Sequence, residues 1–155
     1  MPFLKLVHFV GSAMWIGGFL AALLLVSGAR DEAEHVRAGL FRLLAQVYTT
    51  VIGLGAVLTL GSGILWGMSL SDSGGVENGT VSVAFWVMVL AGFVGGLLVL
   101  FVAMPTAIRL ARAAVPTPDG RLTPTFERHR GRLLAASLVA EVLALVSLFA
   151  AVGPW

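Results

Sequence analysis

Residues 81–108 read VSVAFWVMVLAGFVGGLLVLFVAMPTAI, a long run without any ionisable side chain. The hydrocarbon core of a bilayer is about 30 Å thick, and a helix that rises 1.5 Å per residue crosses it in about 20 residues. This run is long and apolar enough to do so. It therefore predicts a transmembrane helix.

Three further stretches of the chain have the same character: residues 6–28, 47–70 and 133–155. Within the four stretches the only ionisable residues are His8 and Glu141. The pattern Val36, Leu40, Leu44 ahead of residue 47 predicts that the second helix begins before it enters the membrane. The sequence thus predicts an all-α fold, a four-transmembrane-helix bundle that forms a single domain over residues 1–155.

The composition excludes several classes of protein. Of 155 residues, 58% are hydrophobic and 12% are charged, which excludes a soluble enzyme, a nucleic-acid-binding module and a disordered tail. The net charge is only +2, and the chain contains no cysteine, so it has neither a disulfide nor a thiolate metal site. Any metal or cofactor must be held by histidine, methionine, carboxylate or packing. The expected partner is the lipid bilayer, and no nucleic acid is expected.

The distribution of basic residues predicts the orientation of the bundle. Nine of the ten bases lie in the first and third connections: Arg30, Arg37, Arg42, Arg109, Arg112, Arg121, Arg128, Arg130 and Arg132. By the positive-inside rule these connections are cytoplasmic, so both termini are extracytoplasmic. Trp66, Trp86 and Trp155 would then lie at the outer interface, as in an aromatic belt.

His8 is the first candidate for chemistry. Residues Gly11, Ser12, Trp15 and Phe19 follow it at helical spacing and share its face, so the imidazole should point into the bundle beside small residues that leave space. A neutral imidazole is a good ligand for a metal or for haem iron, and an ionisable group inside a membrane is a functional-site hypothesis by default. The alternative is a packing histidine that is hydrogen-bonded across helices.

Two methionines are predicted at the depth of His8, namely Met68 and Met88. His35 and His129 lie on the order of 40 Å away, which excludes a bis-histidine haem within one chain. Four kinds of site remain: a haem with one protein ligand, a His/Met haem, a Cu(I) site of histidine and thioether sulfurs, or a site completed by His8 of a second protomer.

Two further charged residues have a predicted role. Glu141 lies near the middle of the fourth stretch, with Ser137 one turn before it on the same face. It is either a proton relay or cation-passage group, or a neutral acid that hydrogen-bonds a neighbouring helix or partner subunit. Lys5 either extends to the lipid headgroups or anchors a haem propionate or an anionic substrate at the outer surface.

Small residues and one proline predict how the helices pack. Gly63 with Gly67, and Gly92 with Gly96, have the four-residue spacing that allows two helix backbones to approach. Such glycines also leave room for a flat macrocycle. Pro105 removes a hydrogen bond to the Phe101 carbonyl and should kink the third helix.

The run Leu4-Lys5-Leu6-Val7-His8-Phe9-Val10-Gly11 followed by Trp15-Ile16-Gly17-Gly18 resembles a signature of small bacterial integral membrane proteins. The same signature resembles the copper-resistance protein D (CopD) domain and, more distantly, is similar to the HemJ-type protoporphyrinogen oxidases. The resemblance implies a multi-pass protein of the bacterial inner membrane. Its HemJ-like branch implies haem b bound through His8, and its CopD branch implies copper uptake or resistance. The end of the chain departs from the HemJ-type pattern.

Three functional hypotheses follow. The first is a haem-b redox protein, in electron transfer or porphyrin oxidation, with His8 as axial ligand, Gly11 leaving room, and Trp15 and Phe19 flanking the macrocycle. The second is a copper-handling protein that uses His8 with Met68 or Met88 and has Glu141 as relay. The third is a structural subunit, as a homo-oligomer or part of a larger membrane complex.

Overall fold

A computed structural model describes residues 2–29, 32–72, 82–114 and 123–152 of the chain, without the side chains of residues 34 and 70–72. Its described part contains four helices that are long and apolar enough to cross a membrane: Pro2–Gly28, His35–Ser69, Val83–Ala113 and Pro124–Val152. The predicted all-α bundle of four transmembrane helices is therefore confirmed, and the chain is a multi-pass membrane protein. The second helix begins before residue 47, as its apolar pattern predicts.

The four helices consist of eight segments in chain order. These are α1 (Pro2–Gly28), α2 (Glu34–Gln46), η1 (Val47–Ile52), α3 (Gly53–Asp72), α4 (Val83–Leu98), η2 (Val99–Ala103), α5 (Met104–Ala113) and α6 (Pro124–Val152). The segments η1 and η2 are π-helical turns within the second and third helices. Two helix starts are capped by hydroxyl groups, since Ser82 Oγ accepts from Phe85 N–H and Thr123 Oγ1 from Phe126 N–H.

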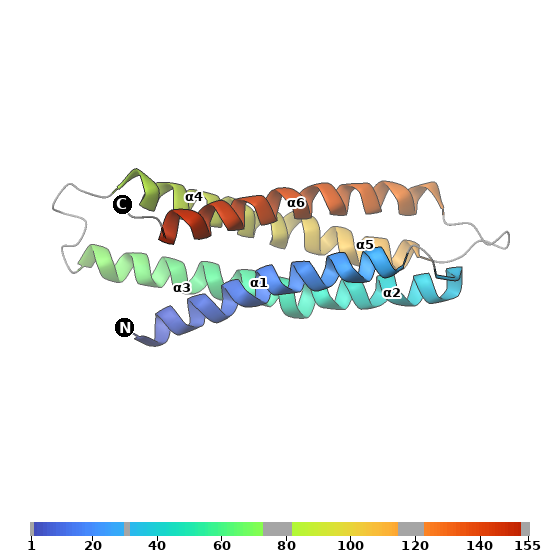
Figure 1. Cartoon of the computed structure of the whole chain (residues 1–155), viewed down its shortest axis with the longest axis horizontal. Coiled ribbons are helices and arrows are strands. Elements are labelled where there is room, and N and C mark those ends of the chain that lie inside the picture. The colour runs from blue at the N-terminus through green and yellow to red at the C-terminus, as the bar shows by residue number, and fades with distance from the viewer. Residues whose placement is uncertain (1, 30–31, 73–81, 115–122, 153–155) are drawn as a thin grey trace.

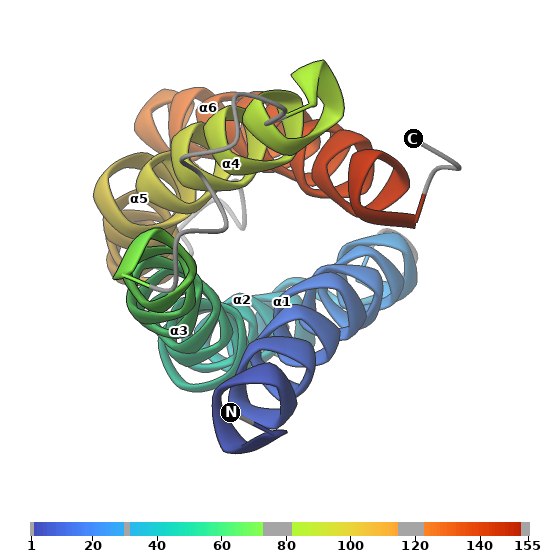
Figure 2. The same cartoon turned by 90° about the vertical axis from the view of Figure 1, so that its left-hand side faces the viewer.

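The bundle is built from two helical hairpins. In the first hairpin α1 packs along α3, and in the second α4 packs along α6. The hairpins contact each other mainly where α2 packs on α5 (Figures 1 and 2). The described chain begins and ends at the same end of the bundle, which we call the terminal end (Figure 1). The first and last described residues thus lie at the same end of the bundle, and that this end is extracytoplasmic stays a prediction.

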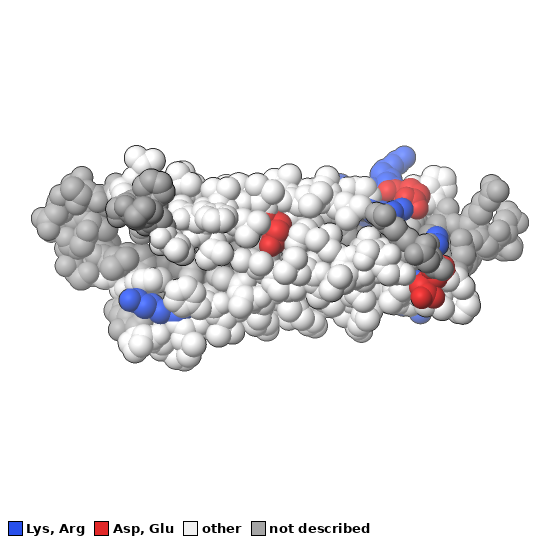
Figure 3. Space-filling view, viewed as in Figure 1, with Lys and Arg blue, Asp and Glu red and all other residues white. Residues whose placement is uncertain are grey.

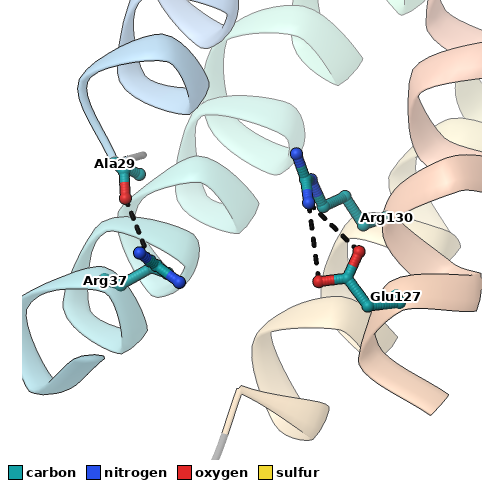
Figure 4. Close-up of polar contacts among 4 residues, drawn as sticks. All are labelled: Ala29, Arg37, Glu127 and Arg130. Atoms are coloured by element: carbon teal, nitrogen blue, oxygen red, sulfur yellow. Dashed lines mark hydrogen bonds and ion pairs between the residues drawn. The ribbon is translucent and has the colours of Figure 1, made fainter. Parts of the chain in front are cut away.

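Charged side chains mark the opposite end of the bundle, which we call the arginine end. Figure 3 shows basic and acidic groups gathered there, with one basic group near the terminal end. Figure 4 shows two local contacts of arginines at this end. Arg37 Nε donates a hydrogen bond of 3.0 Å to Ala29 O, and Arg130 forms an ion pair of 3.1 Å with Glu127. Trp155 and residues 73–81 lie outside the described residues.

Of the glycines whose spacing predicts close helix contacts, Gly63, Gly92 and Gly96 lie against a neighbouring helix, and Gly55, which is outside these pairs, does so as well. A Cβ atom at Gly55 would lie 2.7 Å from both Gly11 O and Trp15 N, so the backbones of α1 and α3 touch at this crossing. At Gly96 a Cβ atom would lie 2.7 Å from Leu60 Cδ1. Gly67 differs, because nothing lies within 4 Å of its Cβ position.

The third helix is irregular just before Pro105, although its form differs from a simple kink. The Met104 N–H donates to Val99 O, five residues back, so the helix widens into the π-helical turn η2 immediately before the proline. In the second helix the Gly53 N–H likewise donates to Tyr48 O, without any proline nearby. Helix widening of this kind is frequent at functional sites.

The packed core of the bundle does not extend to its terminal end. The most deeply buried large side chains are Leu44, Ile52, Val99, Leu110 and Phe126, which lie toward the arginine end or near mid-length. Among the residues whose burial is described, none before residue 11, from 63 to 90, or after 144 is buried. The terminal end therefore presents side chains that are not covered by protein.

Candidate functional site around His8

His8 lies on the second turn of α1 and contacts α3. Its Nδ1 atom is 3.0 Å from Thr59 O and 3.2 Å from Ser62 Oγ. The Thr59 carbonyl can only accept a hydrogen bond, so Nδ1 must carry the proton. Ser62 agrees with this assignment, because its hydroxyl already donates to Leu58 O and can only accept from the imidazole.

This hydrogen bonding fixes the tautomer of the ring. With the proton on Nδ1 of a neutral imidazole, Nε2 of His8 has a free lone pair. Nε2 makes no hydrogen bond to any residue that the structure describes, and the side chain is half-buried. An N–H donated to a backbone carbonyl, with the other nitrogen free, is the usual arrangement of a histidine that ligates a metal.

The imidazole ring of His8 packs against Gly63 and lies beside the indole ring of Trp66. A Cβ atom at Gly63 would lie 3.3 Å from Cε1 of His8, so a side chain at this position would press on the ring. The Trp66 ring lies edge-on to His8 with a centroid distance of 6.1 Å, and Lys5 Nζ is 5.2 Å from the centre of the Trp66 ring. Together these residues form a polar and aromatic cluster at the terminal end.

His8 lies at the edge of the packed core. Gly11, the first buried residue of α1, is less than one turn away along the helix. Beyond His8 toward the terminal end lies the region without buried side chains, and Gly67 there has nothing within 4 Å of its Cβ position. The site therefore combines a fixed imidazole with apolar surface that no other part of the described chain covers.

The other residues predicted to lie with His8 are placed differently. Trp15 is 3% exposed and reaches across the bundle, where a Cβ atom at Gly95 would lie 3.3 Å from its Cη2 atom. Phe19 is buried one turn deeper and lines a narrow apolar cavity beside Tyr48. The space beside Gly11 is filled by the α3 backbone, since a Cβ atom there would lie 2.8 Å from Thr59 N.

The two methionines lie on different hairpins of the bundle. Met68 on α3 is 61% exposed, so its thioether points away from the bundle interior. Met88 lies on α4, in the second hairpin, and its backbone carbonyl accepts a hydrogen bond from Ser147 on α6. His8 instead contacts α3. The structure thus brings neither sulfur into a described contact with the imidazole.

Glu141 belongs to a second polar region near mid-length. It is 7% exposed, and its Oε2 atom is buried without a hydrogen-bond partner among the residues described. One turn earlier on α6, Ser137 forms a hydrogen bond of 2.6 Å with the Tyr48 hydroxyl, and both residues are buried. An acidic group is also visible at mid-length in Figure 3. The carboxyl group therefore belongs to a different polar region from the His8 cluster, which lies at the terminal end.

Several residues of the site were missed in the sequence. Thr59 and Ser62 hold the imidazole, and Tyr48 pairs with Ser137, yet only Ser137 was singled out. The available signal was a pair of hydroxyl residues three apart in an apolar helix, which places them on one face. Within the described residues there is no group of three or more His, Asp or Glu side chains that could hold a metal ion.

Comparisons with models of protein families, with curated proteins and with solved structures give no match for this chain.

Proposed function

We propose that the protein is a membrane haem-b redox protein in which Nε2 of His8 would bind the haem iron. The observation that carries the proposal is the hydrogen bond from Nδ1 of His8 to the Thr59 carbonyl, supported by Ser62. It leaves Nε2 unprotonated, in the state that haem iron requires. Bound haem supplies one-electron chemistry, because its iron alternates between the ferric and ferrous states.

The residues around His8 fit a macrocycle that is apolar over most of its area and anionic at one edge. The terminal end has unpacked apolar surface, and Gly67 presents no side chain there. Lys5 provides a cation on the same helix as His8, three residues earlier, and Trp66 keeps it close to the site. Lys5 would pair with a propionate, while apolar helix surface would exclude water from the iron.

Thr59 and Ser62 act on the ligand through Nδ1. By accepting its hydrogen bond they fix the direction in which Nε2 points, and they increase the electron-donating power of the imidazole. With haem bound, this stronger donor would favour the ferric state and so lower the reduction potential. Thr59 and Ser62 would therefore set both the direction of Nε2 and the potential of the bound group.

Absorption spectroscopy tests the proposal. Protein purified after expression with ample haem should show a Soret band, and His8→Ala should lose it. His35→Ala and His129→Ala remove histidines on the arginine side of the bundle and should retain the band. Colourless wild-type protein, or His8→Ala protein that keeps a wild-type spectrum, contradicts the proposal.

A potentiometric titration tests the role of the hydrogen bond separately. Ser62→Ala removes one acceptor from Nδ1 and leaves the Thr59 carbonyl in place. The variant should still bind haem, with a reduction potential higher than that of the wild type. Ser69→Ala is a matched control, because Ser69 lies on the same helix and donates only to Trp66 O. An unchanged potential in Ser62→Ala would show that Ser62 does not tune the ligand.

A further inference from the structure

A groove lies between the two hairpins near the arginine end, on the side where α2 packs against α5. Arg42, Ala45, Gln46 and Thr49 line it from α2 and η1, and Ile108, Ala111 and Arg112 line it from α5. The groove thus has an arginine on each side and small or apolar residues between them. It is separate from the His8 cluster, which lies on α1 and α3 at the terminal end.

The two groove arginines are not neutralised by the side chains that the structure describes. Arg37 and Arg130 at the same end of the bundle donate to Ala29 O and Glu127 respectively (Figure 4). Arg42 and Arg112 take part in no ion pair within the described part of the chain, and no acidic residue lines the groove. Two guanidinium groups that flank one groove suit a phosphate group.

The polar groups beside the arginines add a second requirement on the ligand. The Thr49 hydroxyl already donates to Ala45 O and Gln46 O, at 3.0 and 3.1 Å, so toward the groove it can only accept a hydrogen bond. Gln46 contributes an amide that both donates and accepts. The two arginines of the groove therefore offer N–H donors to a phosphate group. Thr49 and Gln46 offer acceptors for a hydroxyl group that lies next to this phosphate.

The position of the groove along the helices favours a lipid over a soluble phosphate. Ala45, Ile108 and Ala111 form an apolar wall, and Phe101, two turns from Ile108 toward the middle of the same helix, is 73% exposed. An acyl chain could lie along this exposed surface while the headgroup remains between the arginines. Basic pockets between transmembrane helices commonly bind anionic headgroups in this way.

We propose that the groove between α2 and α5 is a binding site for an anionic glycerophospholipid whose headgroup carries a free hydroxyl, such as phosphatidylglycerol. Arg42 and Arg112 bind the phosphate, and Thr49 with Gln46 accepts from the headgroup hydroxyl. The site lies where the two hairpins contact each other, so bound lipid holds them together. This proposal does not depend on haem binding at His8.

Native mass spectrometry of the full chain in a neutral detergent tests the site, with phosphatidylglycerol or phosphatidylcholine added. Wild-type protein should retain phosphatidylglycerol in preference to phosphatidylcholine. The double variant Arg42→Gln/Arg112→Gln should bind phosphatidylglycerol about tenfold more weakly. The control Arg128→Gln/Arg132→Gln removes the same charge from exposed positions on α6 and should bind within about twofold of wild type.

Two further measurements separate the alternatives. Thr49→Val should weaken binding of phosphatidylglycerol but leave binding of phosphatidic acid, which has no headgroup hydroxyl, unchanged. Excess inorganic phosphate should not displace the lipid. An equal loss in the α6 control would mean general charge attraction, and displacement by phosphate would mean a site for a soluble anion; either result overturns the proposal.

Discussion

Gly55 lies where α1 and α3 approach most closely, and a side chain there would meet backbone atoms that cannot move aside. We predict that Gly55→Ala lowers the free energy of unfolding by about 1–3 kcal/mol, because its Cβ would lie 2.7 Å from Gly11 O and Trp15 N. Gly61→Ala is the matched control on the same helix, with nothing within 4 Å of its Cβ position. Reversible unfolding in mixed micelles measures both. Equal effects would contradict the packing described.

The Tyr48 hydroxyl and Ser137 form a buried hydrogen bond between the two hairpins. A double-mutant cycle with Tyr48→Phe and Ser137→Ala should give a coupling energy of about 0.6 kcal/mol, and at most about 1.7 kcal/mol. The same unfolding assay measures it. A coupling energy of zero would mean that the two hydroxyls contribute independently.

The sequence singles out His8 as a candidate site residue, but it does not identify the residues that form hydrogen bonds with it. Helical periodicity places Gly11 and Ser12 on the face of His8, yet it carries no information on which residues of α3 lie opposite. That register is determined by the contact of Gly11 with Gly55 and Thr59, which needs the three-dimensional crossing of two helices. For the same reason the depth of Met68 could be counted, whereas its outward direction could not.

At the scale of elements, α3 and α4 contact each other through Leu60 and Gly96. We predict that Gly96→Ala is destabilising because its Cβ would lie 2.7 Å from Leu60 Cδ1, and that adding Leu60→Ala removes most of this effect. The interaction energy should be at least about 0.5 kcal/mol. Gly55→Ala offers a contrast, since backbone atoms oppose it and Leu60→Ala should not rescue it. Additive effects at Leu60 and Gly96 would contradict this prediction.

The two π-helical turns differ in whether the sequence could predict them. Pro105 signals an irregularity in the third helix because it lacks an N–H, and η2 lies directly before it. Nothing comparable marks η1, where the Gly53 N–H donates to the Tyr48 carbonyl and no proline is nearby. A widened turn without proline depends on how neighbouring helices pack, so it could not be predicted from local sequence.

At the scale of the whole molecule, the absence of cysteine from the chain makes the orientation easy to test. Phe3→Cys lies next to the start of α1 on a residue that is 72% exposed, and Arg132→Cys lies at an exposed position in the arginine-rich first part of α6. In intact bacterial cells a membrane-impermeant maleimide should label Phe3→Cys, and it should label Arg132→Cys only after permeabilisation, because the arginines favour the cytoplasmic side. The reverse pattern would show the opposite orientation.

The number of transmembrane helices could be predicted because each apolar run is long enough to cross a bilayer. How these helices pack against one another could be predicted only in part. Short connections predict antiparallel neighbours, which agrees with the pairing of α1 with α3 and of α4 with α6. The unpacked terminal end, however, depends on how the two hairpins diverge, and apolar residues there look the same in the sequence as those of the core.

The two-hairpin architecture bears on how the protein is made. Most contacts of α1 are with the hairpin formed by residues 2–72, and most contacts of α4 are with residues after 82. Residues 2–72 can therefore form most of the contacts of α1 in the membrane while the second half is still being translated. A gene divided within the codons for residues 73–81 should accordingly yield two polypeptides that insert separately and reassociate in the bilayer.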